Sequence, residues 1–362
     1  MMAPVMAALS WQSAARAEAP LAGIAIPNIL WESSSEVEDT LQSIKSAGFE
    51  AVRIGWKQPY AGAEAALLEA TRNGLAVVVT IPLIDATVAE AGAQQRPATK
   101  GFFASYGLSQ IDPNRLEDAA ERLADFVSTQ AVGLIGIEVG NEMNWSGYNG
   151  DLMIGKGRII SNLDQLDAEQ EAAFLLGLDR YVEALERVEA VVYTYDWSTD
   201  VAVISGGLAD INLDYIEHRG ATLVEPSLVW RLLNERQAFR HLDGVGLHIY
   251  EPLRPGFEDD DREQMLTSFT DNCLSPLFGS LPCWITEFGM AIPAEDCAPD
   301  DLDRRERLDP LRAYLRSELG AQQVKATFFY DWSGDAAFSL ERCGRPTALA
   351  QDLTSTSTLP TD

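Results

Sequence analysis

Eight short apolar runs recur along the chain, and nearly every one is followed by a longer amphipathic segment. The runs cover residues 22–26, 51–54, 75–81, 134–139, 201–205, 244–249, 283–286 and 324–330. Apolar runs of this length, bounded by polar or turn residues, are typical of buried strands. Repeated alternation of strand and helix predicts a parallel sheet, because only a crossover segment returns the chain to the same edge.

The intervening segments have the periodicity of helices that cover a sheet. In 36–44 and 116–126, apolar residues recur three and four positions apart. Predicted helices span residues 35–47, 61–73, 114–128, 167–191, 228–240, 261–269, 303–319 and, more briefly, 347–353. Eight repeats predict a closed (β/α)8 TIM barrel. An open doubly wound sheet is the alternative, but it would usually carry a glycine-rich phosphate turn, and residues 24–33 contain none.

The chain is predicted to form a single domain over residues 20–353. No Pro/Ser-rich linker or low-complexity block interrupts this region. Long insertions follow the third and fourth predicted strands, at 85–112 and 143–166. In a barrel such loops line the carboxyl face, where functional sites are built.

The chain is strongly acidic. Its 362 residues include 27 basic and 55 acidic side chains, for a net charge of -28. This charge disfavours nucleic acid, anionic lipid and polyanionic substrates, since no clustered Lys/Arg stripe offsets it. Neutral partners are favoured, although solubility alone also explains the acidity. A membrane span is not predicted, because no apolar run approaches the roughly 20 residues that a bilayer requires.

The amino end has features of a leader segment. Residues 1–11 are mildly apolar, and Ala15-Arg16-Ala17 and Ala17-Glu18-Ala19 are small-residue cleavage sites, although a positively charged start is missing. We expect residues 1–19 to be a signal peptide or disordered leader and residues 354–362 to be a disordered tail. A leader of this kind indicates a periplasmic or secreted protein.

Four cysteines lie toward the carboxyl end. Pairing Cys273 with Cys283 and Cys297 with Cys343 would link the loops around the last two predicted strands. Four cysteines allow three connectivities, so this pairing is one hypothesis among them. Free buried thiols in a cytosolic protein are the alternative. The spacing contains no Cys/His metal motif.

Two glutamates stand at the ends of apolar runs, where a carboxylate is costly unless chemistry or a partner needs it. Glu142 follows the fourth run in GIEVGNEMN (136–144), and Glu287 ends the seventh in CWITEFGM (283–290). Asn141 places an amide for a substrate hydroxyl beside the first carboxyl, whose burial would suit a general acid. Taken singly, each glutamate is also explained by a structural ion pair.

Taken together, the two glutamates predict a reaction. On a barrel, the ends of strands four and seven face each other across the mouth. Two carboxyls about 5 to 5.5 Å apart are what retaining glycoside hydrolysis requires. We therefore expect Glu142 to be the acid/base and Glu287 the nucleophile.

The chain resembles the clan A retaining glycoside hydrolases. In this (β/α)8 group the acid/base glutamate follows an asparagine at strand four, and the nucleophile ends strand seven. Asn141-Glu142 and Glu287 match that pattern. In GLHIY (246–250), His248 and Tyr250 are similar to the His-x-Tyr of family 5, where the tyrosine hydroxyl supports the nucleophile.

Two further strand ends match the same group. Arg53 in AVRIGW resembles the arginine that keeps the nucleophile ionised, and Trp332 in FFYDWSG resembles the tryptophan on which the cleavage-subsite sugar stacks. Trp56, Trp145 and Tyr148 are expected to add stacking surfaces along a cleft. The resemblance covers roughly residues 20 to 350.

Two positions depart from family 5. Met143 stands where that family usually has a proline after the acid/base glutamate. Thr80 stands at the end of the third strand, where a histidine is common. The pattern therefore also resembles family 39-like and other bacterial clan A relatives, and the glycan stays open.

The resemblance implies a retaining, endo-acting β-glycosidase for a neutral poly- or oligosaccharide, with neither cofactor nor metal. A non-catalytic carbohydrate-binding barrel is the alternative, and the intact glutamate pair argues against it. A metal-dependent hydrolase or deaminase would need a His-x-His strand with further ligands. The three histidines, His218, His241 and His248, are too scattered to supply one.

Overall fold

The computed structural model describes residues 19–99, 102–155, 157–197, 200–211, 213–250, 261–291 and 301–355. Eight parallel strands form one sheet, in the order β6-β4-β3-β2-β1-β10-β9-β8. They are β1 (Leu21–Ala25), β2 (Ala51–Gly55), β3 (Ala76–Ile81), β4 (Leu134–Val139), β6 (Ala202–Ser205), β8 (Val245–Tyr250), β9 (Cys283–Gly289) and β10 (Val324–Phe329).

Two isolated parallel β-bridges connect the two edges of the sheet. Ile204 pairs with Gly244 and Leu208 with Leu247, so the β6 and β8 segments meet and the barrel is nearly complete. The predicted (β/α)8 TIM barrel is therefore confirmed, and the open doubly wound sheet is excluded.

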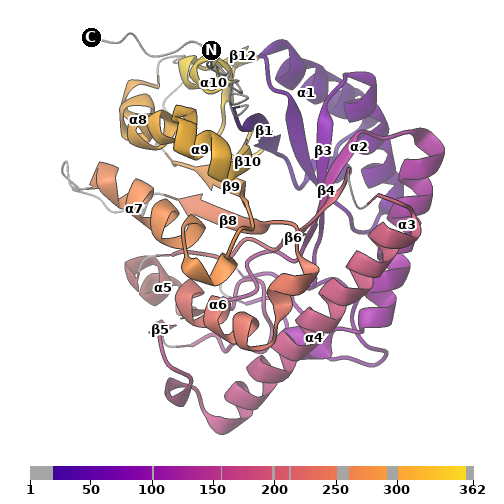
Figure 1. Ribbon diagram of the computed structural model, residues 1–362, viewed down its shortest axis with the longest axis vertical. Helices are drawn as coiled ribbons and strands as arrows, with labels where there is room; N and C mark the ends of the chain where they lie inside the picture. The colour runs from indigo at the N-terminus through magenta and orange to yellow at the C-terminus, as the bar shows by residue number, and fades with distance from the viewer. Residues whose placement is uncertain are drawn as a thin grey trace, which may run out of the picture.

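Helices surround the barrel, with α1 to α4 along one side and α7 to α10 along the other (Figure 1). The α-helices are α1 (Ser34–Ser46), α2 (Tyr60–Arg72), α3 (Pro113–Gln130), α4 (Ala168–Thr194), α5 (Leu213–Arg219), α6 (Pro226–Glu235), α7 (Asp261–Cys273), α8 (Leu302–Arg316), α9 (Glu318–Gln323) and α10 (Ala348–Thr354). Short 3-10 turns are η1 (Ile29–Trp31), η2 (Leu108–Gln110), η3 (Leu163–Gln165), η4 (Ala238–His241) and η5 (Pro276–Phe278).

Side-chain caps determine where the longer helices begin. Ser33 accepts a hydrogen bond from the Glu36 N–H, and the Glu36 carboxylate accepts one from the Ser33 N–H, a capping box at the start of α1. Asp112 caps α3 and Asp167 caps α4. The predicted starts of these three helices, at residues 35, 114 and 167, each lie within one residue of the observed start.

Short elements depart from the prediction. The predicted helix 228–240 ends at Glu235, since Gln237 adopts a left-handed backbone with φ 59° before η4. The parallel pair β5 (Arg158–Ile160) and β7 (Thr222–Val224) and the hairpin β11 (Glu341–Arg342) and β12 (Arg345–Pro346) were not predicted. Elements of two or three residues are too short to show a hydrophobic period.

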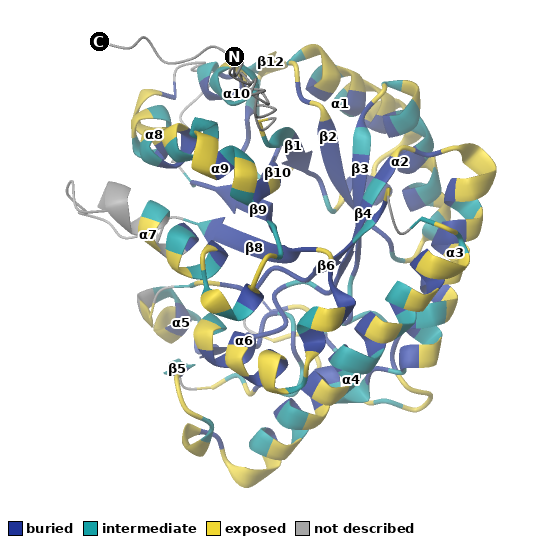
Figure 2. Ribbon diagram, viewed as in Figure 1, coloured by how far each residue is buried: buried dark blue, intermediate teal, exposed yellow. Residues whose placement is uncertain are grey.

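Strands and helices of the barrel differ in how far their residues are buried. Strands β2 and β9 are buried along their whole length, whereas the helices bury one face and expose the other (Figure 2). The predicted disulfide between Cys273 and Cys283 is confirmed, and it joins the end of α7 to the start of β9. The second predicted pair cannot be followed in the same way, because Cys297 lies outside the described residues.

The predicted leader and tail also lie outside the described part of the chain, apart from residue 19 and residues 354–355. Among the described helices, none combines the length and the apolar character needed to cross a bilayer.

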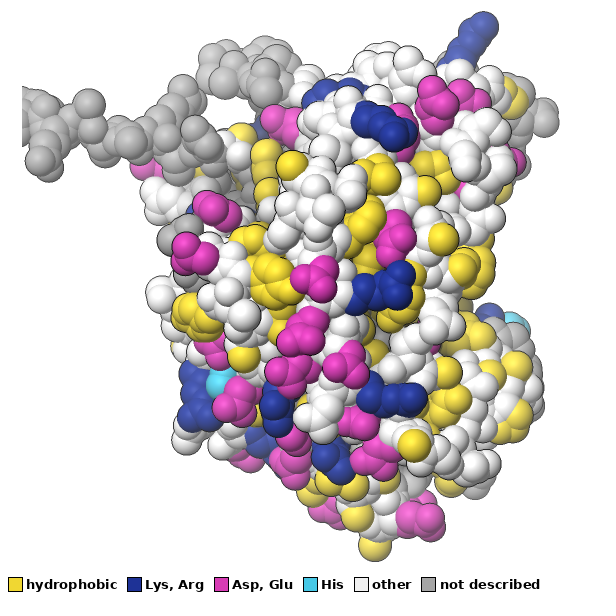
Figure 3. Space-filling view, turned by 90° about the vertical axis from the view of Figure 1, so that its right-hand side faces the viewer, with side chains coloured by type: hydrophobic (Ala, Val, Ile, Leu, Met, Phe, Trp, Pro, Cys, Tyr) yellow, Lys and Arg dark blue, Asp and Glu magenta, His cyan; other side chains and the backbone are white. Residues whose placement is uncertain are grey.

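Charges of both signs are intermixed on the face shown in Figure 3. Ion pairs also join neighbouring helices: Arg122 on α3 contacts Glu64 on α2 at 2.8 Å, and Arg187 on α4 contacts Glu117 on α3 at 3.1 Å. Exposed pairs of this kind contribute little to stability. The charge on this face therefore indicates a solvated surface.

Candidate active site

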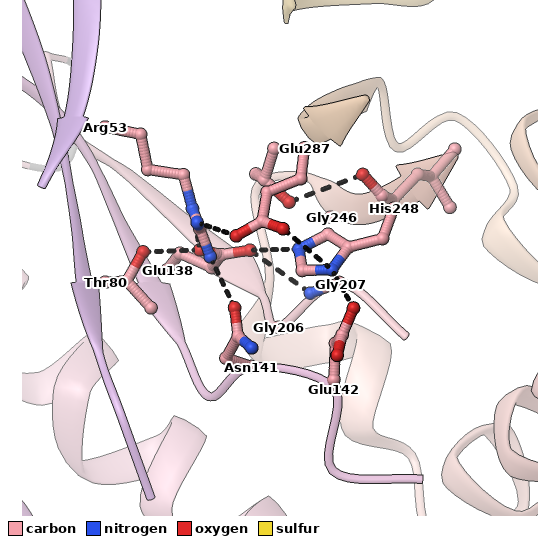
Figure 4. A network of polar contacts seen from close by, with 12 residues as sticks. Arg53, Thr80, Glu138, Asn141, Glu142, Gly206, Gly207, Gly246, His248 and Glu287 are labelled. Carbon is pink, nitrogen blue, oxygen red and sulfur yellow. Dashed lines mark hydrogen bonds and ion pairs between the residues drawn. The ribbon is translucent and has the colours of Figure 1, made fainter. Parts of the chain in front are cut away.

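One arginine connects three strands at the carboxyl end of the barrel. Arg53 on β2 has only 1% of its surface exposed. Its Nε donates to Glu138 Oε2 on β4 at 2.6 Å, and its Nη1 donates to Glu287 Oε1 on β9 at 2.5 Å. Its Nη2 donates to Asn141 Oδ1 at 2.7 Å (Figure 4). Because the planar guanidinium uses all three nitrogens, it holds three side chains at fixed positions.

Glu138 is the residue of this site that sequence reasoning missed. It is fully buried on β4, where its Oε2 also accepts from Thr80 Oγ1 at 2.6 Å and its Oε1 accepts from the Gly207 N–H at 3.1 Å. The signal was present in the sequence, since a glutamate within the apolar run 134–139 requires a buried partner. Thr80, at the position where family 5 commonly has a histidine, is part of this carboxylate's hydrogen bonding.

Glu287 is surrounded by donors and positive charge. Besides Arg53, the Tyr250 hydroxyl donates to its Oε2 at 2.6 Å. Burial alone would raise the pKa of Glu287, but His248, Arg53 and Tyr250 together outweigh burial and hold the pKa below its ordinary value. Burial and the adjacent Glu287 carboxylate raise the pKa of Tyr250 well above its ordinary value, so its hydroxyl stays a donor.

Glu142 sits in the turn after β4 with a left-handed backbone, φ 45°. Its N–H donates to the Gly207 carbonyl at 2.8 Å, which fixes this turn against the segment after β6. The Trp145 indole N–H donates to Glu142 Oε2 at 2.9 Å, and His248 Nδ1 lies 3.0 Å from Oε1. A positive φ in a residue other than glycine is uncommon and is concentrated at functional sites.

His248 lies between the two glutamates. Its Nδ1 is 3.8 Å from Glu287 Oε2, and its ring is completely enclosed. Burial lowers the pKa of His248, but Glu287 and the hydrogen bond to Glu142 outweigh burial and raise it. Glycine is required at Gly207, because a Cβ there would lie 2.0 Å from His248 Cδ2.

The two glutamates are close enough to act on one bond. One carboxylate oxygen of Glu142, one of Glu287 and a ring nitrogen of His248 lie within 4.8 Å of one another. Such a triplet has the spacing of metal ligands, but Arg53 places its positive charge 2.5 Å from Glu287. A divalent cation would be repelled there, so the donor set does not fit a metal ion.

A cavity of about 890 Å³ opens over this cluster. Arg53, Asn141, Glu142, Tyr250 and Glu287 all line it. The cavity is also lined by aromatic side chains from several segments that follow the strands: Trp31, Phe103, Trp145, Tyr148, Tyr215, Tyr330 and Phe338. It therefore combines two carboxylates with flat apolar surfaces.

Not every predicted platform faces this cavity. Trp332 is fully buried and packs edge-on against Phe49, with ring centroids 5.9 Å apart, so it presents no face to a ligand. Tyr330, directly after β10, lines the cavity, whereas Trp332, two residues further on, does not. Trp56 is also buried, and its indole donates to the Ala119 carbonyl at 2.9 Å. The alternation of side chains along a strand does not predict the direction of the chain after the strand ends.

No protein-family model and no curated protein matches this chain. Solved structures match most of its length. An endo-β-1,4-mannanase from Thermotoga petrophila is 11% identical with a TM-score of 0.56, over 93% of this chain and 76% of that one. A GH5-4 broad specificity endoglucanase from an uncultured bacterium is 13% identical with a TM-score of 0.51, over 94% and 93%.

A calcium-binding mutant of Bacteroides uniformis β-glucuronidase 2 is 16% identical, with a TM-score of 0.50 over 89% of this chain. The match covers 32% of the glucuronidase, so the chain spans about a third of that protein. Identities this low show a shared fold. The neighbours include many glycoside hydrolases, and the resemblance to the clan A (β/α)8 group is confirmed as a likeness of fold.

Replacing Arg53 with methionine should lower the free energy of unfolding by about 3 to 5 kcal/mol, because the buried Glu138 carboxylate would lose its charged partner. Denaturant titration at neutral pH measures this loss. Arg72→Met is the control: its ion pair with Glu69 is exposed and should contribute below about 1 kcal/mol. Equal effects of the two substitutions would contradict a charge-dependent role for Arg53.

Proposed function

We propose that this protein is a retaining glycoside hydrolase that cleaves β-glycosidic bonds of a neutral poly- or oligosaccharide. The observation that carries the proposal is the pair Glu142 and Glu287, with carboxylate oxygens within 4.8 Å in an aromatic-lined cavity. Retaining enzymes have carboxyls about 5 to 5.5 Å apart, whereas inverting enzymes leave about 6.5 to 9.5 Å for a water.

The first step forms a covalent intermediate. The Glu287 carboxylate attacks the anomeric carbon, the bond from that carbon to the leaving oxygen breaks, and Glu142 gives its proton to that oxygen. In the second step, the Glu142 carboxylate removes a proton from water, whose oxygen attacks the same carbon and releases Glu287. Two inversions at one carbon leave the β-configuration unchanged.

The neighbouring residues support these roles. Arg53 and Tyr250 keep Glu287 ionised and oriented, while Trp145 and His248 hold the Glu142 carboxyl from two sides. Asn141 directs its Oδ1 to Arg53, which leaves its amide N–H as the donor for a sugar hydroxyl.

The substrate class follows from the cavity and the neighbours. A mannanase and an endoglucanase share the fold, and the names of both describe polysaccharide substrates. Aromatic faces bind the apolar faces of sugar rings. A leader of the kind predicted for residues 1–19 would place the enzyme in the periplasm or outside the cell, where such polymers are met.

The decisive experiment is reducing-sugar release from β-mannans and β-glucans by the full chain and by Glu287→Gln. This nearly isosteric change should lower release by at least about a thousandfold, since an amide is not a nucleophile. Equal release by both proteins would disprove the role of Glu287. Retention of glycans on an affinity gel without turnover in either protein would favour a carbohydrate-binding barrel.

Glu142→Ala tests the acid. It should lose activity on polysaccharides by about 100-fold or more but keep most activity on aryl β-glycosides whose leaving group needs no proton. Equal losses on both kinds of substrate would contradict an acid role.

Trp31 should extend the substrate-binding surface. It is 61% exposed and lines the cavity, while its neighbours Ile29 and Leu30 are buried and hold η1 in place. We expect Trp31→Ala to lower kcat/KM about tenfold for long oligosaccharides and far less for the shortest substrate. Tyr193→Ala is the matched control, because Tyr193 is 64% exposed and does not line the cavity. A loss that is independent of chain length would contradict this role.

The acidic limb of the pH profile should depend on Tyr250. Glu287 must be ionised to attack, and its lowered pKa keeps it so as the pH falls. Tyr250→Phe removes one hydrogen bond that stabilises the carboxylate, so the pKa of Glu287 rises and the acidic limb of kcat/KM moves to higher pH. An unshifted limb would show that Tyr250 does not set this ionisation.

A further inference from the structure

Lys57 lines the large cavity, although lysine side chains usually extend toward solvent. It lies two residues after the end of β2, the strand that holds Arg53 and ends at Gly55. Because Arg53 and Gly55 are two positions apart, a side chain on Gly55 would point the same way as Arg53, toward the inside of the barrel. Lys57 Cε lies 3.8 Å from the position that a Cβ on Gly55 would take. The lysine side chain therefore folds back over the mouth of the barrel.

The Lys57 ammonium is half-buried and has no fixed partner. Burial lowers the pKa of Lys57, the Asp85 carboxylate opposes this effect, and the nearby Arg53 charge adds to it. Within the described part of the chain, Nζ makes neither a hydrogen bond nor an ion pair. A charged donor at the wall of a cavity is available to bind an oxygen atom of a ligand.

Asp85 supplies an acceptor on the adjacent segment. It follows β3, the neighbour of β2 in the sheet, and it lines the same cavity. Its Oδ1 accepts from the Thr87 N–H at 2.8 Å and from Thr87 Oγ1 at 2.9 Å, and these two bonds orient the carboxylate. Its Oδ2 has no hydrogen bond to the residues that the structure describes. Lys57 and Asp85 thus present a donor and an acceptor that attract each other without forming an ion pair.

This pair of charges suits a neutral sugar better than an anion. A hydroxyl both donates and accepts, so one of two adjacent hydroxyls can accept from an ammonium while the other donates to a carboxylate. An anionic ligand would be attracted by Lys57 but repelled by Asp85, Glu142 and Glu287, which line the same cavity. Trp31, which follows the adjacent strand β1, adds an exposed aromatic face to this side of the cavity.

We propose that Lys57 and Asp85 form a sugar-binding subsite beside the catalytic pair, which recognises two free adjacent hydroxyls of a neutral sugar unit. Lys57 Nζ donates to the oxygen of one hydroxyl, and Asp85 Oδ2 accepts from the other. A substituent on either hydroxyl removes one of these bonds, so the subsite selects glycan chains that are unsubstituted at this unit. The inference rests on the proposed function, because it assigns the subsite to the same substrate.

Calorimetric titration with β-1,4-mannan and β-1,4-glucan oligosaccharides tests the subsite. The protein is the full chain with Glu287→Gln, so that the ligand stays intact, with and without Lys57→Met. We expect Lys57→Met to weaken binding about tenfold or more, because a charged hydrogen bond is lost. Lys325→Met is the control, since Lys325 is exposed on β10 and does not line the cavity. Unchanged affinity in Lys57→Met, or the same loss in Lys325→Met, would overturn the proposal.

Asp85→Asn tests whether the two residues hold the same sugar unit. It should weaken binding about threefold or more, and its effect should be smaller when Lys57→Met is already present, since contacts to one ligand group are coupled. Fully additive losses would contradict a shared unit.

An acidic ligand and added salt separate a neutral occupant from an anionic one. The contribution of Lys57 to binding of the neutral oligosaccharides should change less than about twofold on addition of salt. Tighter, salt-sensitive and Lys57-dependent binding of a glucuronic acid oligosaccharide would overturn the neutral subsite, as would the absence of binding by every neutral oligosaccharide.

The same variants separate the subsite from the proposed function. Binding that depends on Lys57, without turnover by the unsubstituted chain, would support the subsite and disprove the hydrolase. Turnover with the same KM in the unsubstituted chain and in Lys57→Met would disprove the subsite and leave the hydrolase intact.

Discussion

The ion pairs of Arg53 with Glu138 and Glu287 are the interaction on which the rest of the site depends. Three carboxylates and one histidine are enclosed at the carboxyl end of the barrel, and a single guanidinium offsets much of their charge. Carboxylates enclosed without such a partner would take up protons instead of remaining ionised. The arrangement therefore fixes geometry and protonation together, since the hydrogen bonds that orient Glu287 also stabilise its charged form.

The strands of the barrel hold the charged residues of the site, and the connecting segments supply its aromatic walls. Arg53, Glu138 and Glu287 lie on strands that pair with a neighbour on both sides, and Tyr250 lies on β8, which pairs with β9. The aromatic walls come from connecting segments, including the long insertions after β3 and β4. In (β/α)8 barrels, residues at strand ends carry the chemistry and the loops at the carboxyl face shape the binding site.

Sequence reasoning was most successful where the signal was local and repeated. The eight strands, the starts of α1, α3 and α4, and the position of Glu287 at the end of an apolar run all follow from short-range patterns. Glu138 was missed because its partner, Arg53, lies 85 residues away and only the closed sheet brings them together. Trp332 was misplaced for a similar reason, since it packs against Phe49, a contact between residues far apart in the sequence.

The backbone of Glu142 has a consequence for how this protein would change under selection. Its φ of 45° is a conformation that glycine adopts freely and a glutamate adopts only under constraint. A lineage that no longer needed the carboxyl would gain backbone freedom by accepting glycine at this position, but it would also lose the acceptor of the Trp145 indole N–H. Glu142 and Trp145 are therefore expected to be replaced together once activity is no longer under selection.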